Sequence, residues 1–127
     1  MTWIASRYGF FSVVCARKGS GAHAQPVDPD RLMIRARDPR HLLNLQEAFA
    51  DQLGGFEILR TNADYPARFI VPKVVFAEVA RKLVMDIGYD NFKSEVYKRE
   101  GSTEYEGALH RVWSVFRGIE PKDARGS

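Results

Sequence analysis

Apolar residues alternate with long or charged side chains through residues 31–37, RLMIRAR. Because successive side chains of a strand point to opposite faces, this period of two predicts a half-buried strand. Its buried side is expected to carry Leu32, Ile34 and Ala36. The other side, with Arg35 and Arg37, is expected to face solvent.

Three further segments have the pattern of strands. Residues 3–17 are rich in aromatic and β-branched side chains, and Gly9 interrupts them, which predicts either a bent strand or a tight hairpin. Residues 56–61 and 67–71 flank the turn sequence NADYP and predict two more strands. Between the first two predicted strands, residues 18–30 combine glycines and prolines, which predicts a mobile loop.

A first helix is predicted directly after the strand RLMIRAR. The Asp38 carboxylate can accept the free N–H groups of a first helical turn, and a proline at position 39 is tolerated there. The apolar residues that follow are three or four positions apart, which places them on one stripe of the helix. These residues are Leu42, Leu45, Phe49 and Leu53.

Three more helices are predicted after the last strand. Residues 72–88 form the longest one, and its buried side is expected to carry Phe76, Val79, Ala80, Leu83 and Ile87. The segment YDNFK begins a short helix, for which Asp90 is the expected N-terminal cap. Thr103 and Glu106 form a capping box before the last helix. The residues of that helix expected to be buried are Tyr105, Leu109, Val112, Trp113 and Phe116.

The predicted order of the main elements is strand, strand, helix, strand, strand, helix, helix. This order predicts an α+β fold, with a four-stranded antiparallel sheet and the helices on one face. If the first strand takes the place normally held by a last one, the arrangement resembles a permuted ferredoxin-like fold. A chain of 127 residues fits one domain, which is expected over residues 1–118, followed by a disordered tail at residues 119–127.

Several segments together resemble a family of short uncharacterised proteins from bacteria and their phages. In chain order they are WIASRYGFFSVV, LMIRAR, DYPARF, YDNFK and HRVWSVF. The resemblance covers most of residues 3–116. It implies no particular activity and no particular site residues.

Composition restricts the location and the kinds of partner. The single cysteine, Cys15, excludes an internal disulfide, and a chain without one fits the reducing cytoplasm, which is the expected location. No apolar run reaches the roughly 18–20 residues that a membrane-spanning helix needs, so no membrane partner is expected. The net charge of +3 permits an acidic partner but is lower than expected of a dedicated duplex-DNA-binding protein.

The sequence contains no motif that is specific for catalysis or metal binding. Its three histidines, His23, His41 and His110, do not share a local spacing typical of metal ligands. Cys15 lies at an apolar strand end, which is typical of a core residue rather than of a nucleophile. We therefore expect a non-catalytic protein with no cofactor and no metal.

The outward side of residues 31–37 carries the preferred functional hypothesis. Arg35 and Arg37, joined by Arg68 from the last predicted strand, are expected to bind an anionic ligand, either single-stranded nucleic acid or a nucleotide. Tyr8 and Tyr65 are expected to supply the aromatic stacking that RNA-binding sheets use.

Two other functions are compatible with the sequence. The first is a protein–protein interaction module, such as an adaptor or an inhibitor encoded by a phage or another mobile element, because the chain is rich in tyrosine, tryptophan and arginine. A homodimer is compatible with that hypothesis. The second is a small phosphate-ester enzyme.

Overall fold

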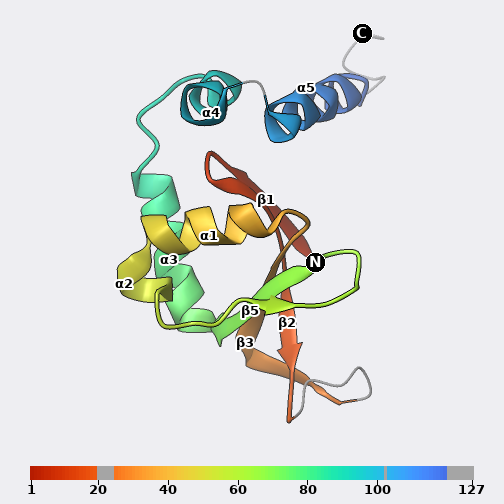
Figure 1. Ribbon diagram of the computed structural model, residues 1–127, viewed down its shortest axis with the longest axis vertical. Helices are drawn as coiled ribbons and strands as arrows, with labels where there is room; N and C mark the ends of the chain where they lie inside the picture. Colours follow the sequence, from red (N-terminus) through yellow and green to blue (C-terminus); the bar gives the residue numbers. More distant parts are fainter. Residues whose placement is uncertain (20–24, 102, 120–127) are drawn as a thin grey trace, which may run out of the picture. The chain divides into compact units, whose positions relative to one another are not determined.

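The computed structural model describes residues 1–19, 25–101 and 103–119 (Figure 1). The chain divides into two compact units, residues 1–88 and residues 89–127. The first unit contains β1 (Thr2–Ser6), β2 (Gly9–Arg17), β3 (Val27–Ala36), α1 (Pro39–Ala48), α2 (Ala50–Leu53), β4 (Leu59–Arg60), β5 (Ala67–Pro72) and α3 (Lys73–Met85). The second unit contains α4 (Phe92–Glu100) and α5 (Glu104–Arg117). The single domain expected over residues 1–118 stays a prediction, and residues 120–127 of the expected tail lie outside the described residues.

The first unit is built on a five-stranded antiparallel sheet with the strand order β1-β2-β3-β5-β4. The predicted α+β class is therefore confirmed. The sheet has five strands rather than the four expected, because the first apolar segment reverses at Arg7 and Tyr8 and forms the hairpin β1–β2. A hairpin was one of the two forms that the glycine in this segment predicted.

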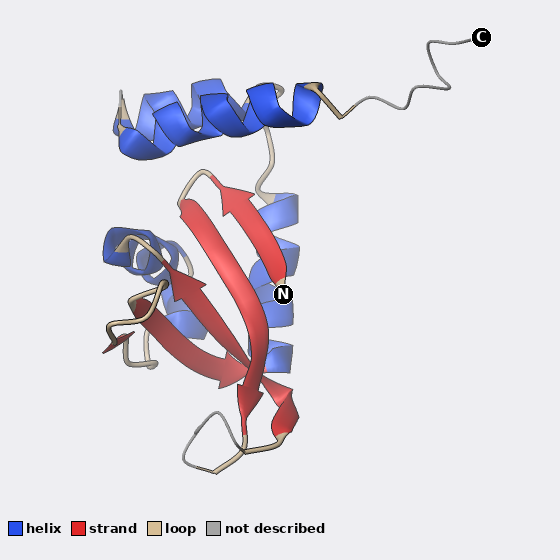
Figure 2. Ribbon diagram, turned by 90° about the vertical axis from the view of Figure 1, so that its right-hand side faces the viewer, coloured by secondary structure: helices blue, strands red, loops and turns tan. Residues whose placement is uncertain are grey.

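The helices of the first unit gather on one side of the sheet (Figure 1), and Figure 2 shows the strands from another direction. The predicted apolar stripe of the first helix is buried over its whole length, although Phe49 breaks it into α1 and α2. From α3, Phe76 and Val79 are buried, but Ile87 is 55% exposed because α3 ends before this position. The strand residues of the same core are Phe11, Ile34, Ala36, Ala67, Phe69 and Val71.

The β2–β3 connection is shorter than predicted. Residues 27–30, expected in a mobile loop, belong to β3, because Val27 and Asp28 pair with the end of β2. A register shift after Cys15 makes room for the additional residues of β3, including Pro29, which has no N–H group to donate. Residues 20–24 of the expected loop lie outside the described residues.

Two of the three predicted helix caps are confirmed. The side chains of Asp38 and Thr103 accept the backbone N–H groups of Arg40 and Glu106, at 3.0 Å and 3.2 Å. The predicted cap of α4, Asp90, is wrong. The next residue caps the helix instead, because its backbone is extended and its side-chain oxygen reaches the N–H group three positions on.

The apolar stripe of α5 is only partly covered. Tyr105 and Leu109 are buried as predicted, but Val112, Trp113 and Phe116 are exposed by 46%, 52% and 63%. In the second unit α5 packs against α4, which has 9 residues against the 14 of α5. Because a helix rises about 1.5 Å per residue, α4 can cover only part of its neighbour.

The β1–β2 hairpin packs against α1 at Gly9, where β2 begins. Gly9 has a φ of +154°, and a Cβ atom there would lie 2.8 Å from Nδ1 of His41 and closer still to its Cγ. The buried His41 ring approaches so closely because its Nδ1 accepts the backbone N–H of Phe10 at 3.2 Å. Only glycine fits both this backbone conformation and this space.

We therefore expect Gly9→Ala to lower the free energy of unfolding by at least about 2 kcal/mol, since it combines backbone strain with an overpacked contact. Urea denaturation measures the difference. Gly55→Ala is the matched control, because its added methyl group would meet no atom within 4 Å and should change stability little. Equal losses in the two variants would show that the hairpin does not depend on this contact.

Candidate anion-binding site

One row of side chains crosses all five strands on the face of the sheet that is opposite the helices of the first unit. Residues directly paired across strands point to the same face of a sheet. The pairs that make up this cross-strand row are Trp3 with Ser12, Ser12 with Arg35, Arg35 with Arg68, and Arg68 with Leu59. Ile34 and Phe69, which precede and follow the two arginines in the chain, point into the core on the other face.

Tyr65 holds two guanidinium groups together at the centre of this row. The Cζ of Arg35 lies 4.8 Å from the centre of the Tyr65 ring, and the Cζ of Arg37 lies 5.3 Å from it. Arg37 follows the end of β3 and is exposed, whereas Arg35 and Tyr65 are half-buried. A neutral ring orients the two cations without cancelling their charge.

Arg68 joins these residues from β5. Its Nη2 donates to the hydroxyl oxygen of Thr61 and to the backbone carbonyl of Tyr65, each at 3.2 Å. Arg35 donates from its Nη2 to the hydroxyl of Ser12 at 2.8 Å. We refer to Arg35, Arg37 and Arg68, together with Tyr65, as the arginine cluster. These hydrogen-bond acceptors are all neutral, so they do not compensate the charge of the cluster.

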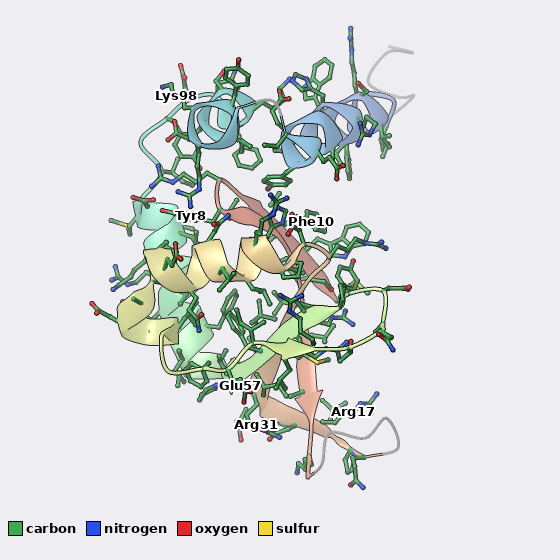
Figure 3. The ribbon with its side chains drawn as sticks, viewed as in Figure 1. Tyr8, Phe10, Arg17, Arg31, Glu57 and Lys98 are labelled. Carbon is green, nitrogen blue, oxygen red and sulfur yellow. The ribbon has the colours of Figure 1, made fainter. Side chains whose placement is uncertain are left out.

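No carboxylate of the described residues is paired with the cluster. Within residues 1–19, 25–101 and 103–119, no ion pair includes Arg35, Arg37 or Arg68. Arg31, on the same strand, contrasts with them because its Nε lies 2.8 Å from the Asp28 carboxylate. Figure 3 shows Arg31 and Arg17 near the far end of the β2–β3 pair, away from the labelled Tyr8 and Phe10.

The cluster carries an electrostatic cost. Burial, and next to it the charge of Arg35, lower the pKa of Arg68 below its usual value. The Nε atoms of both residues are buried, and neither has a hydrogen-bond partner among the described residues. Since a lowered pKa means that the folded state disfavours the charged form of Arg68, the cluster reduces stability at neutral pH. A bound anion would offset this cost.

The structure places Tyr8 away from the cluster, although the sequence grouped them. The Tyr8 ring is buried in the core, at 5.7 Å and edge-on to Phe49, and its hydroxyl donates to the Asp86 carboxylate at 3.2 Å. Arg7 also bonds to both the Tyr8 hydroxyl and Asp86. Tyr8 lies in the hairpin turn, where the alternation of a strand no longer determines the direction of a side chain.

The two residues that β1 and β2 contribute to the row were not grouped with the arginines by sequence reasoning. Ser12 is fully buried and bonds to Arg35, and Trp3 lies beside the ring of Phe10, with the ring centres 5.9 Å apart. Their positions depend on the register of the β1–β2 hairpin. The sequence predicted either a hairpin or a single bent strand for this segment and so did not define that register. Recognising Gly9 as the start of a second strand would have placed both side chains on the arginine face.

Other kinds of site receive no support from the described residues. Among them, no group of three histidine, cysteine, aspartate or glutamate side chains is arranged to hold a metal ion. No helix formed by the described residues has both the length and the apolar character needed to cross a membrane. The first unit therefore presents an antiparallel sheet face with an arginine cluster that has no carboxylate partner among the described residues. Comparison of the chain with protein-family models, curated proteins and solved structures finds no match.

Like charges directly opposite each other destabilise a sheet, and dissolved salt screens them. We expect the free energy of unfolding of the wild-type protein to rise with sodium chloride concentration, and to rise less in Arg68→Gln. Arg60→Gln removes the same charge from an exposed residue of β4 and is the matched control. Urea denaturation at several salt concentrations gives the slopes. Identical slopes in the two variants would contradict a repulsion centred on Arg35 and Arg68.

Proposed function

We propose that this protein is a small non-catalytic module that binds an anionic ligand, single-stranded nucleic acid or a nucleotide, at the arginine cluster. The observation that supports this most strongly is the gathering of Arg35, Arg37 and Arg68 with no ion pair among the described residues. Three cations beside one another are unfavourable unless something else lowers their energy, and a phosphate group does so directly.

The chemistry of the cluster fits phosphate. A guanidinium group presents its N–H donors in a planar fork that matches two oxygens of a phosphate, and hydrogen bonds between charged partners are the stronger ones. Tyr65 and Ser12 already orient the side chain of Arg35, so less freedom is lost when a ligand binds. In this role Tyr65 positions the arginines, and Tyr8, which is hydrogen-bonded within the core, is left out of the proposed site.

Three broader expectations are also proposals. We propose that the protein acts in the cytoplasm, which its single cysteine supports. Kinship with the short bacterial and phage proteins is supported by the motifs that the chain shares with them. The permuted ferredoxin-like relationship is supported by an antiparallel sheet whose helices in the first unit pack on one face.

Binding of labelled oligothymidylate, followed by fluorescence anisotropy, tests the proposal. We expect the double variant Arg35→Gln with Arg37→Gln to bind about 100-fold more weakly, since hydrogen bonds to charged groups contribute about 1.5 kcal/mol or more each. The slope of log K against log salt concentration should also become shallower by about 1.4, because two phosphate contacts are lost.

The matched control is Arg81→Gln with Lys82→Gln, which removes the same charge from α3 on the other side of the sheet. This control should retain nearly all of the affinity. If both double variants weaken binding equally, the protein attracts nucleic acid by net charge alone, and the arginine cluster is not the site.

A second candidate function, protein recognition, is supported by the uncovered side of α5. Its apolar residues remain exposed by 46–66%, and they are Val112, Trp113, Val115, Phe116 and, just beyond the helix, Ile119. Residues 107–119 contain no aspartate or glutamate, but they include two arginines. The cations of Lys93 and Arg117 lie 4.7 Å and 5.4 Å from the Trp113 ring. The complementary partner is a protein surface that is apolar at its centre and acidic at its border.

This second function requires that the exposed residues of α5 contribute little to folding. We expect Val115→Ala with Phe116→Ala to lower the free energy of unfolding by less than about 1 kcal/mol in total. Leu109→Ala, at a buried position of the same helix, should cost about 2–5 kcal/mol. Denaturation of the three proteins provides the comparison. A loss in the double variant as large as that of Leu109→Ala would make this surface part of a core.

A further inference from the structure

We infer that the ligand of the proposed site is a single-stranded nucleic acid of at least two nucleotides, with Trp3 and Phe10 as the platform on which a base stacks. This inference rests on the proposed anion-binding function. It assigns a role to the aromatic side chains at the β1 end of the row, which do not belong to the arginine cluster.

The aromatic pair lies on the same face as the arginine cluster. Trp3 is paired with Ser12, which is paired with Arg35, so the three side chains share a face. Phe10 precedes Ser12 by two positions on β2 and therefore points the same way. The Trp3 and Phe10 rings are 5.9 Å apart and tilted by 52°.

The pair is also accessible. Trp3, on the edge strand β1, is 62% exposed, and Phe10 is half-buried. The indole N–H donates to the sulfur of Met1 at 2.9 Å. A base that stacks on this ring would cover apolar surface without displacing a core contact.

The spacing of the strands decides between a single nucleotide and a longer ligand. Trp3 lies on β1, Arg35 on β3 and Arg68 on β5. Neighbouring strands are about 4.8 Å apart, so β3 lies roughly 10 Å from β1 and β5 lies roughly 14 Å from it. A base and its own phosphate are separated by one sugar, which can bridge the shorter interval at most. Contact with Trp3 and with Arg68 together requires a second phosphate, and hence a second nucleotide.

A ligand that lies across the strands would contact the aromatic pair and the arginine cluster at the same time. Its base would cover Trp3 or Phe10, and its phosphates would lie over Arg35, Arg37 and Arg68. Linking two contacts in one molecule makes the second contact intramolecular, so a longer strand gains affinity without a new kind of interaction. Stacking on an aromatic ring is tolerant of base identity, because every base has a π face.

The test uses Trp3 as its own reporter. The chain has two tryptophans, so Trp113→Phe leaves Trp3 as the only indole. Thymidine monophosphate, a thymidine dinucleotide and a longer oligothymidylate are titrated into this variant, and the quenching of its fluorescence is followed. We expect the longer strand to quench Trp3 and to bind at least about tenfold more tightly than the monophosphate.

Substitution of Trp3 then separates stacking from charge. Trp3→Leu should weaken binding of the longer strand by about tenfold, and Trp3→Phe should restore most of the loss, since a ring is present again. Far-ultraviolet circular dichroism confirms that both variants are folded. Inorganic phosphate should compete only weakly with the longer strand, because it occupies the arginine cluster alone and leaves the stacking platform free.

The outcomes distinguish the inference from the function on which it rests. If Arg35→Gln weakens strand binding while Trp3→Leu leaves it unchanged, or if the monophosphate binds as tightly as the strand, the anion site stands and the stacking platform is wrong. If no nucleotide or strand binds at all, the proposed function falls together with the inference. An acidic peptide that binds as tightly as the strand would also overturn the inference.

Discussion

The arrangement of the outer sheet face depends most on the buried core, which holds two like charges opposite each other on neighbouring strands. Arg35 on β3 and Arg68 on β5 are direct partners in the sheet, and in the described chain no carboxylate pairs with either. Their neighbours Ile34 and Phe69 are fully buried, so neither strand can turn over without moving the core into water. The core therefore fixes the two arginines on the outer face, where their repulsion persists and where an anion would be stabilised.

The hairpin β1–β2 connects this constraint to the rest of the first unit. Gly9 lets the hairpin approach His41 on α1, and the bond from the Phe10 N–H to Nδ1 holds the beginning of β2 there. From that point the register of β2 places Ser12 beside Arg35 and Trp3 beside Ser12. The contact of one glycine with a helix on the core side thus determines which aromatic side chains border the arginines on the other side.

The sequence predicted most reliably those features that a few adjacent residues determine. The period of two in residues 31–37, the caps at Asp38 and Thr103, and the stripe from Leu42 to Leu53 are local patterns, and the structure has them. It did not predict features that depend on distant contacts. The position of Tyr8 follows from its bond to Asp86, far along the chain. The exposure of the apolar side chains of α5 depends on the length of α4. Local periodicity predicts neither this exposure nor the position of Tyr8.

Side-chain NMR of the arginine Nε–Hε groups tests the central claim most directly, because it observes each guanidinium group separately. On addition of oligothymidylate, the account predicts that the resonances of Arg35, Arg37 and Arg68 shift. Those of Arg31 and Arg40, which are paired with Asp28 and Asp38, should stay in place. The account is contradicted if the paired arginines shift and the three residues of the cluster do not.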